Sequence, residues 1–469
     1  MLRIQKKAIS TKRISLIVAD LLILQVSFLL AALIRFGFAN TPRYISERWL
    51  SFYLIIPVFL IVFYVVDLYD IKRDYRRLTE SLQVAAGTAI SILISVFISY
   101  LLFYGNLSFT LGRGVLSLYA LFVFFGILGW RWLYSLLGVR GVFSKKVILV
   151  GYPGQMTKLQ PLLQEIHSDM DLSFGGFISL PQEPGLPAPP PPDDLTLGTT
   201  ERLPEIVKRE DPDVLVLALP SERFQPLIRD LIWCNQRGIE IRDVISFSEE
   251  YFKRIPLEHI DDLWFLISYI NIPKIHTHRI KRLIDLGISL FALTLFLPVA
   301  LLVAVLIKIE SRGRLFFIQE RIGKDGEPFA VIKFRSMIRD AEVETGPTWA
   351  MIDDPRVTRI GKFMRRWRLD ELPQFLNVLR GEMSLVGPRP ERREFVEELK
   401  AKVPYFMERL SVKPGITGWA QVESAYASSV EESQRKLEYD LYYIKNISFL
   451  LDTLILLKTL RVVVLGKGR

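Results

Sequence analysis

The chain has 469 residues, of which half are hydrophobic, 12% are aromatic and 23% are charged, and its net charge is +10. This composition is too apolar for an ordinary soluble protein and indicates that part of the chain lies in lipid. A single cysteine, Cys234, excludes an intramolecular disulfide and a cysteine metal cluster. Because the basic residues flank apolar runs, the expected partners are anionic membrane lipids and phosphorylated substrates, and not nucleic acid.

Four apolar runs occupy the N-terminal part of the chain, at residues 14–34, 50–66, 84–104 and 115–137. Each reaches or approaches the ~20 residues that a helix needs to cross a bilayer. Strongly basic segments precede the first run, separate the second from the third and follow the fourth. The positive-inside rule places these segments, and everything after residue 137, in the cytoplasm. Residues 1–140 are therefore predicted to form four transmembrane helices.

Residues 141–262 alternate between short apolar runs and helical patterns. Strands are expected at 145–152, 174–179, 213–219 and 239–245, and helices at 154–168, 203–210 and 223–237. This alternation predicts a parallel, Rossmann-like α/β domain. A nucleotide-binding glycine fingerprint would need a second glycine where the chain has Pro153, so a structural or regulatory role is favoured over nucleotide binding. Whether this domain binds a ligand stays open.

A fifth apolar run, at 286–307, has basic residues on both sides. The positive-inside rule would put both flanks in the cytoplasm, which a straight span cannot satisfy. Pro298, near the middle of the run, removes a backbone donor and kinks a helix. Residues 263–312 are therefore expected to form a linker and a re-entrant helical hairpin that enters and leaves one leaflet. The alternative is a fifth span, which would place the rest of the chain outside the cell.

Two adjacent carboxylates, Asp370 and Glu371, lie in a basic stretch at 367–390 that ends in a Gly-Pro-Arg-Pro turn. Such a pair suits phosphoryl transfer, because one carboxylate can attack phosphorus while the other holds a divalent metal. Arginines can neutralise the phosphate oxygens. Alone, the same pattern also fits a salt-bridged surface helix.

The whole stretch, together with residues 316–323, 333–337, 413–421 and 439–444, resembles the catalytic core of the bacterial sugar transferases. These monotopic phosphoglycosyl transferases load a sugar phosphate onto a polyprenyl-phosphate carrier. The resemblance is nearly continuous from Gly313 onward, and it implies a mainly helical catalytic domain at 313–469. Many members have a hydrophobic residue, Asn and Gly where this chain has Val422, Glu423 and Ser424. That departure leaves the donor sugar open.

The resemblance implies transfer of a hexose 1-phosphate, of glucose or galactose type, from a UDP-sugar to undecaprenyl phosphate with release of UMP. This reaction initiates the assembly of exopolysaccharide, capsule or O-antigen at the bacterial inner membrane, with the catalytic domain facing the cytoplasm. Asp370 would attack phosphorus and form a covalent phospho-sugar intermediate, and Glu371 would hold Mg²⁺. The family also carries the adjacent α/β domain, and its broken re-entrant helix matches Pro298.

Five further residues are candidate substrate contacts. Lys333 and Arg335 end a strand expected at 329–334, where two cations can meet phosphate or simply solvate a sheet edge. Arg389 lies in the proline-fixed turn, and Arg368 and Gln374 flank the two carboxylates.

Two other classes of function stay open. The apolar runs also fit a polytopic transporter or membrane scaffold, and the α/β domain also fits a nucleotide-sugar oxidoreductase. A transporter would need polar residues lining a path through the membrane, and the apolar runs contain few of them. An oxidoreductase would need a full glycine fingerprint and a Tyr-x-x-x-Lys pair, and the α/β domain has neither. Whether the chain forms a homodimer is likewise open. The C-terminal run at 449–465 is expected on the membrane surface or against the re-entrant helix.

Overall fold

A computed structural model gives the architecture of the chain. It describes residues 11–66, 68–69, 78–104, 113–136, 144–152, 159, 162–166, 172–180, 196–219, 225–260, 262, 264–265, 275–311, 313–338, 354–424 and 429–464. The chain forms two compact units, Met1–Asp243 and Val244–Arg469. The first unit contains the N-terminal helices and an α/β sheet, and the second contains the motif residues of the predicted catalytic domain.

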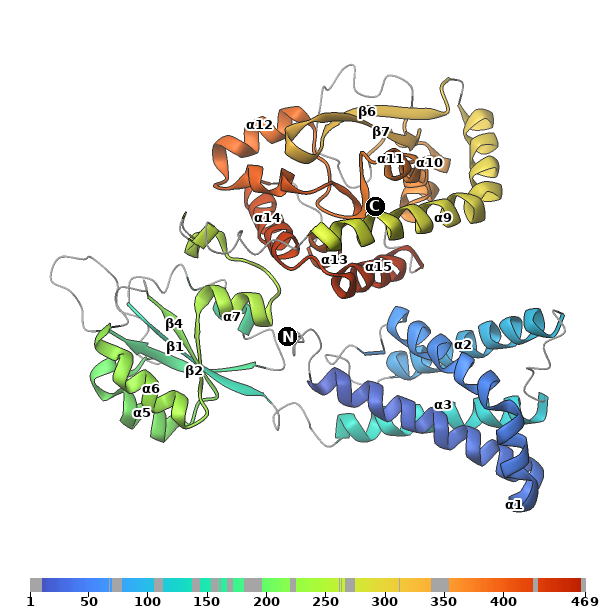
Figure 1. Ribbon diagram of the computed structural model, residues 1–469, viewed down its shortest axis with the longest axis horizontal. Coiled ribbons are helices and arrows are strands. Elements are labelled where there is room, and N and C mark those ends of the chain that lie inside the picture. The colour runs from blue at the N-terminus through green and yellow to red at the C-terminus, as the bar shows by residue number, and fades with distance from the viewer. Residues whose placement is uncertain are drawn as a thin grey trace. The chain divides into compact units, whose positions relative to one another are not determined.

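Long apolar helices form the N-terminal part of the first unit. They are α1 (Thr11–Val65), α2 (Leu78–Tyr104) and α3 (Arg113–Leu136). Gly37, at φ 70°, interrupts α1, so the four predicted apolar helices correspond to the two arms of α1, α2 and α3 (Figure 1). Among the described residues of the first unit, three stretches are long and apolar enough to cross a membrane, Ser15–Trp49, Ser81–Ile98 and Gly114–Tyr134, whereas Phe52–Val65 is a shorter apolar helix.

The parallel sheet of the first unit has the strand order β3-β2-β1-β4-β5. Its strands are β1 (Lys145–Gly151), β2 (Leu172–Ser179), β3 (Thr196–Thr199), β4 (Val214–Ala218) and β5 (Glu240–Asp243). Helices α5 (Leu203–Glu210) and α6 (Ile228–Gln236) pack their apolar residues into its core. This order confirms the predicted Rossmann-like domain. Strand β3 was not predicted, because its four residues carry no apolar pattern; Pro153 and most of the helix expected at 154–168 lie outside the described residues.

The second unit contains short strands between helices. Its elements are α7 (Val244–Tyr251), η5 (Leu257–His259), α9 (Ile275–Glu310), β6 (Phe316–Ile322), η6 (Lys324–Gly326), β7 (Pro328–Phe334), α10 (Arg359–Arg366), η7 (Leu369–Glu371), α11 (Gln374–Arg380), β8 (Ser384–Val386), α12 (Arg393–Lys402), η8 (Phe406–Ser411), β9 (Gly415–Thr417), α13 (Trp419–Glu423), α14 (Val430–Lys445) and α15 (Phe449–Val464). Strands β6 and β7 pair antiparallel, and β8 and β9 pair parallel. Leu385, Leu437 and Ile444 lie at the centre of the core.

Helix α9 is a single bent helix with Pro298 inside it, and not two helices joined by a turn (Figure 1). A straight helix of 36 residues would be about 54 Å long, and its ends could not contact one small domain. Here, Lys281 near the first end donates to Asp452 of α15 at 2.6 Å, and Glu310 at the other end accepts from the Arg359 amide of α10 at 2.8 Å. Both ends therefore meet the same compact unit, as the re-entrant architecture requires.

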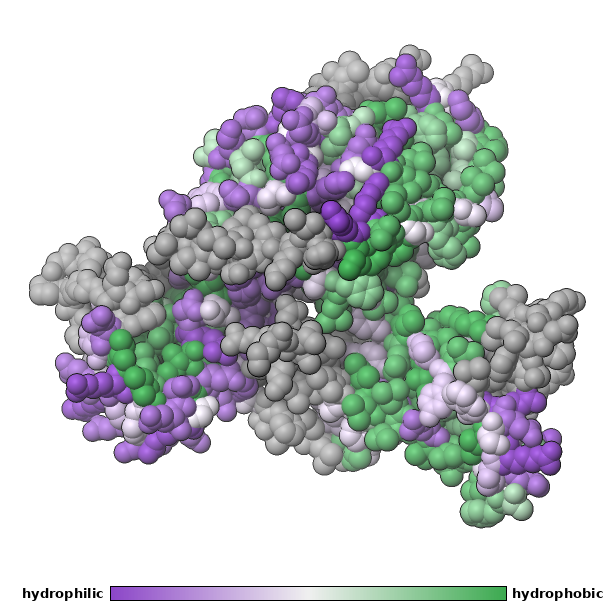
Figure 2. Space-filling view, viewed as in Figure 1, coloured by the Kyte–Doolittle hydropathy of each residue, from purple (hydrophilic) through white to green (hydrophobic). Residues whose placement is uncertain are grey.

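The outer surface of α9 is apolar and exposed. Leu290, Phe291 and Leu301 are 62%, 67% and 60% exposed, and Figure 2 shows hydrophobic residues on this part of the second unit. Arg279–Glu310 is also long and apolar enough to enter a membrane. Helix α15 follows the same pattern at Phe449 and Leu450, while its Ile455 is buried in the core.

The residues from Val244 onward pack with the catalytic elements. Arg254 forms a buried ion pair with Glu438 of α14, the Leu257 amide donates to the same carboxylate at 3.1 Å, and the Trp419 indole donates to the Lys253 carbonyl at 2.8 Å. The domain limits at 140, 262 and 312 stay predictions, but residues 244–260 belong to the second unit, although the sequence grouped them with the α/β domain.

Candidate active site

The two carboxylates lie on a tight turn between α10 and α11. Thr358 caps α10 by accepting from the Gly361 amide at 2.9 Å, and Arg368 then adopts a left-handed conformation, with φ 52°, that ends the helix. The 3₁₀ turn η7 follows at once and carries Asp370 and Glu371. Only 9% and 7% of these two residues is exposed. A surface helix would leave them solvated, so the salt-bridged surface alternative is wrong.

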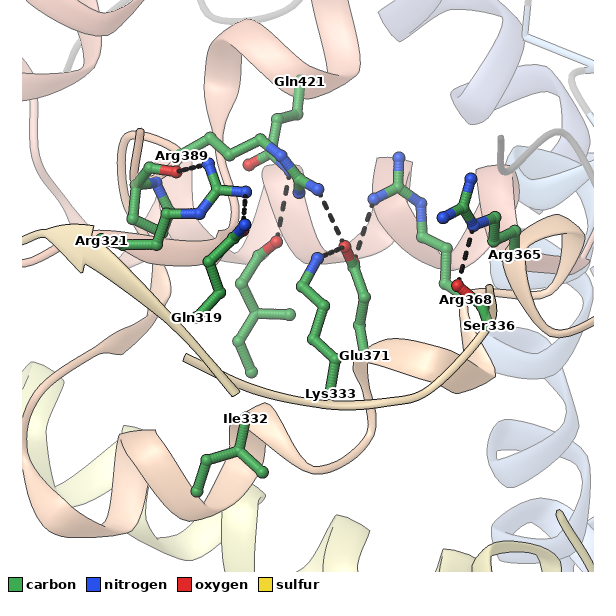
Figure 3. A network of polar contacts seen from close by, with 12 residues as sticks. Gln319, Arg321, Ile332, Lys333, Ser336, Arg365, Arg368, Glu371, Arg389 and Gln421 are labelled. Atoms are coloured by element: carbon green, nitrogen blue, oxygen red, sulfur yellow. Dashed lines mark hydrogen bonds and ion pairs between the residues drawn. The ribbon is translucent and has the colours of Figure 1, made fainter. Parts of the chain in front are cut away.

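Three cations surround the Glu371 carboxylate. Lys333 Nζ and Arg389 Nη2 donate to Oε1 at 3.0 and 2.9 Å, and Arg368 Nη1 donates to Oε2 at 3.2 Å. Figure 3 shows these three side chains converging on Glu371 from β7, from the turn after β8 and from the loop before η7. The sequence therefore identified a set of residues that the fold brings together.

The two carboxylates have opposite electrostatic environments. Burial raises the pKa of Asp370, and the adjacent Glu371 charge raises it further, against the cations Lys333, Arg365 and Arg389. Burial also disfavours ionised Glu371, but Lys333, Arg389 and Arg368 outweigh it and hold its pKa well below the usual range. Glu371 is thus a fixed anion, and Asp370 carries the more weakly stabilised, more basic carboxylate.

Lys333 is positioned by the hairpin of β6 and β7 and by one amide side chain. Asn377 of α11 accepts from the Ile332 amide at 3.1 Å through Oδ1 and donates to the Ala330 carbonyl at 2.7 Å through Nδ2. This amide joins β7 to α11 directly beside Lys333. Because Asn377 is fully buried, its side chain has no water to replace these partners.

Arg389 is positioned by close contact between two glycine turns. The Gly387 amide donates to the Thr417 carbonyl, and the Gly415 amide donates to the Pro388 carbonyl, both at 2.9 Å. A Cβ on Gly387 would lie 2.4 Å from the Lys413 carbonyl oxygen, so only glycine permits this approach. Behind the turn, Arg409 donates to the Arg389 carbonyl at 3.0 Å while paired with a buried aspartate, Asp440, at 2.9 Å.

Two other predicted site residues, Arg335 and Gln374, are not among the three cations that contact Glu371. Arg335 donates to the Ser311 carbonyl and hydroxyl, at 2.9 and 2.7 Å, and so ties the end of β7 to the end of α9. Its described contacts thus differ from those of Lys333. Gln374 is buried, and its Nε2 has no hydrogen-bond partner within the described residues. That amide is a donor available to a substrate.

Three residues around the carboxylates were not among the predicted site residues, although the basic cluster beside Asp370 and Glu371 includes one of them, Arg365. Arg365 contributes a cationic field at Asp370 and is oriented by Ser336, whose hydroxyl accepts from its Nε at 3.0 Å. Asn377 was also missed. The basic cluster before Asp370 signalled Arg365, but no local pattern signalled Ser336 or Asn377, because their partners are distant in the chain.

The carboxylates fit a hard divalent cation that takes most of its ligands from a substrate. Mg²⁺ binds through oxygen, commonly through one or two carboxylates and substrate phosphates. Within the described part of the chain, no group of three or more His, Cys, Asp or Glu residues could hold a metal. Both Glu371 oxygens also contact cations, so protein residues alone do not make a closed metal cage here.

Comparison with known proteins matches each of the two units to a different family model. Residues 276–466 match the family model described as bacterial sugar transferase, and residues 64–242 match one described as CoA-binding domain. The uncharacterized sugar transferase EpsL of Bacillus subtilis is 39% identical over 191 residues, which are 40% of this chain and 89% of that protein. The chain belongs to the bacterial sugar transferase family.

Longer relatives of this sugar transferase have more specific names. A UDP-N-acetylgalactosamine-undecaprenyl-phosphate N-acetylgalactosaminephosphotransferase of Aeromonas hydrophila is 44% identical over 240 residues, 51% of this chain and 56% of that protein. A UDP-glucose:undecaprenyl-phosphate glucose-1-phosphate transferase of Escherichia coli is 37% identical over 240 residues, 50% of this chain and 51% of that protein. The chain thus spans about half the length of these two relatives.

Proposed function

We propose that this sugar transferase moves a sugar 1-phosphate from a UDP-sugar to undecaprenyl phosphate and releases UMP. The observation that carries the proposal is the buried Asp370, whose neighbour Glu371 is held as a fixed anion by three cations. A buried carboxylate of raised pKa is a competent nucleophile, and the cations beside it can receive a diphosphate. Relatives that bear the names of such transferases support the same reaction class.

In the first step, an Asp370 oxygen attacks the β-phosphorus of the UDP-sugar. A bond forms between that oxygen and phosphorus, and the bond from phosphorus to the bridging oxygen breaks, so UMP leaves with the bridging oxygen. Arg389 and Lys333, which contact the neighbouring Glu371, would stabilise the negative charge that develops on the phosphate oxygens. The product on the enzyme is a phospho-sugar ester of Asp370.

In the second step, a phosphate oxygen of undecaprenyl phosphate attacks the same phosphorus. The ester bond to Asp370 breaks, the carboxylate returns and undecaprenyl-diphosphate-sugar leaves. Two displacements at one site avoid the direct meeting of two multiply charged phosphates. The apolar outer surface of α9 supports this assignment, because the acceptor is anchored in lipid and its phosphate lies at the headgroup level.

Glu371 is the residue that would hold a divalent cation, for which the family resemblance implies Mg²⁺. When bound, the cation would offset the charge of the diphosphate and of the departing UMP. The cations Lys333, Arg389 and Arg368 hold the pKa of Glu371 well below its usual range, which favours the ionised carboxylate.

Asp370→Asn tests the proposal directly. The amide keeps the size of the side chain but is not a nucleophile, so UMP release and any radiolabelled sugar-phosphate adduct on the protein should fall below detection. The full chain, purified in detergent, is assayed with UDP-sugars and undecaprenyl phosphate, and membrane insertion serves as the control for folding. An Asp370→Asn protein with ordinary turnover would remove Asp370 from the mechanism.

The donor sugar and the cellular setting are part of the same proposal. The names of the relatives include glucose and N-acetylgalactosamine donors, so a panel of UDP-glucose, UDP-galactose and their N-acetyl forms is the assay that separates them. The reaction would begin the assembly of a cell-surface polysaccharide at the inner membrane, with the second unit facing the cytoplasm, where UDP-sugars are made.

A further inference from the structure

The first residues of β6 are apolar on both faces of the hairpin. Phe316, Phe317 and Ile318 are 42%, 39% and 63% exposed. Successive side chains of a strand point to opposite faces, so neither face is polar at this end. An antiparallel ribbon in water usually keeps one polar face. This end of the hairpin therefore presents an apolar surface that the described residues leave exposed.

The register of β6 and β7 places these three side chains on two different faces of the hairpin. Phe317 is directly opposite Lys333, and Ile318 is directly opposite Ile332. Residues directly opposite in an antiparallel pair share a face. Figure 3 shows Lys333 on the Glu371 side of the hairpin and Ile332 on the other side. Phe317 thus shares the face of the carboxylates, whereas Phe316, which stacks on Phe334 at 5.5 Å, and Ile318 face away.

Along the carboxylate face, β6 changes from apolar to polar. Gln319 and Arg321 follow Phe317 on this face, and Figure 3 shows both on the side of Arg389. Arg321 donates to the Gln319 Oε1 at 2.6 Å and to the Pro390 carbonyl at 3.3 Å. Only the end of the strand that carries Phe317 offers an apolar contact, and that contact is opposite the lysine that binds Glu371.

The apolar end of β6 continues the surface of α9. Arg335 ties the two elements together, because its amide donates to the Leu315 carbonyl at 3.0 Å and its side chain donates to the Ser311 carbonyl at 2.9 Å. The last turns of α9 expose Val305 and Ile309, at 55% and 76%. Apolar side chains therefore extend from the helix that enters lipid to the edge of the carboxylate site.

We propose that Phe317 binds the isoprene units nearest to the phosphate of the polyprenyl-phosphate acceptor. This assignment rests on the proposed function. The acceptor is the substrate that joins an apolar chain to a phosphate, and Phe317 opposite Lys333 presents one contact for each part. The UDP-sugar is hydrophilic along its whole length, and its sugar ring stacked on Phe317 is the competing assignment.

Steady-state kinetics of three variants of the full chain test this assignment. Phe317→Thr removes the aromatic ring while keeping strand preference, Phe317→Leu keeps an apolar side chain, and Ile318→Thr makes the matched change on the opposite face. Loss of one buried aromatic contact should raise the KM for undecaprenyl phosphate about tenfold in Phe317→Thr. The KM for the UDP-sugar should stay within about twofold, and Phe317→Leu and Ile318→Thr should stay close to the parent.

Each other outcome counts against the assignment. If Phe317→Thr raises only the KM for the UDP-sugar, Phe317 contacts the sugar and not the lipid. If Phe317→Thr and Ile318→Thr raise the KM for undecaprenyl phosphate equally, both residues have only a general role in membrane association. If the parent chain forms no lipid product, the proposed function fails instead. A titration of undecaprenyl phosphate followed by tryptophan fluorescence then compares binding to the parent and to Phe317→Thr without turnover, and equal affinities would overturn the role of Phe317.

Discussion

The neighbouring carboxylates Asp370 and Glu371 differ in pKa because different charges lie next to each one. Glu371 contacts three cations directly and stays ionised, whereas Asp370 meets the Glu371 charge at close range and is more basic. Pairs of acids with separated pKa values commonly mark a division of labour in an active site. The division expected here is that Glu371 organises cations and Asp370 attacks phosphorus.

The pH dependence of turnover should report the Asp370 pKa. Because Asp370 must be ionised to attack, kcat/KM should fall as pH drops through a pKa that lies above the ordinary value for aspartate. Glu371→Gln removes the anion that raises this pKa, so the acid limb should move to lower pH. Lys333→Met removes a cation that lowers it, so the limb should move to higher pH.

Both variants should also lose much of their rate, so the direction of the shift is the informative measurement. UMP release is followed across pH at subsaturating UDP-sugar. Shifts of the same sign in Glu371→Gln and Lys333→Met would contradict the assigned electrostatics, as would an acid limb at the ordinary aspartate pKa.

At the level of single residues, the sequence predicted the charged partners but not their supports. Glu371, Lys333, Arg368 and Arg389 were named as site residues, and the fold places them within one hydrogen-bonded group. Arg335 was grouped with Lys333 because both end the same strand. Its actual partner, Ser311, lies 24 residues away, and strand alternation carries no information about such a contact.

Helix α9 is fixed to the catalytic elements by a buried carboxylate. Asp285 accepts from the Ser384 hydroxyl at 2.8 Å and from the Leu385 amide at 3.2 Å. These are β8 residues, and β8 leads directly into the turn that carries Arg389. The position of the membrane helix and the position of a phosphate-binding arginine therefore depend on the same strand.

Asp285→Ala should destabilise the second unit. The change leaves the Ser384 hydroxyl and the Leu385 amide buried without their acceptor, which costs roughly 1–3 kcal/mol. For a domain of this size, each kcal/mol lowers Tm by roughly 2–4 °C. The measurement is thermal unfolding of the purified chain in detergent.

Ser289→Ala is the matched control. Ser289 lies one turn further along α9, is fully buried, and its hydroxyl has no hydrogen-bond partner among the described residues. Its loss should leave Tm unchanged or slightly higher. Equal Tm values for Asp285→Ala and Ser289→Ala would remove Asp285 as the anchor of α9.

At the level of elements, apolar length and periodicity predicted most of the architecture. The helix at 203–210 and the central strands of the α/β sheet lie where the pattern placed them. The sequence also indicated a break at Pro298. The basic residues on both sides of the apolar run and the proline near its middle both favour a helix that enters and leaves the same leaflet. The sequence predicted a re-entrant helical hairpin, whereas the structure has one bent helix, because the form depends on how Asp285 and Glu310 contact the rest of the unit.

At the level of the whole molecule, the catalytic unit has its own core and its own membrane helix. Its core includes Ile255 and Leu257, which precede α9 and were assigned to the α/β domain from the sequence. Composition could not place this boundary, because residues 244–260 continue the same mixture of apolar and polar residues. Contacts with α13 and α14 decide where these residues belong.

Two truncations should therefore behave differently. A chain of residues 244–469 keeps the buried Arg254–Glu438 pair and should insert in membranes, purify as a single species and release UMP from UDP-sugar. A chain of residues 263–469 begins at the predicted boundary and leaves Glu438 buried without its cation, which costs roughly 3–5 kcal/mol. It also loses Ile255 and Leu257 from the core, so it should aggregate or be cleaved quickly by protease.

Replacing Glu438 by Met in the shorter chain isolates the electrostatic part of this loss. With the buried charge gone, the shorter chain should regain part of its protease resistance, whereas Glu438→Met in residues 244–469 should lower stability, because it leaves the Arg254 guanidinium buried and unpaired. Limited proteolysis of the four proteins in the same detergent gives the comparison. Equal resistance of the two unsubstituted truncations would show that residues 244–262 contribute nothing to the catalytic fold, and the unit would then begin where the sequence placed it.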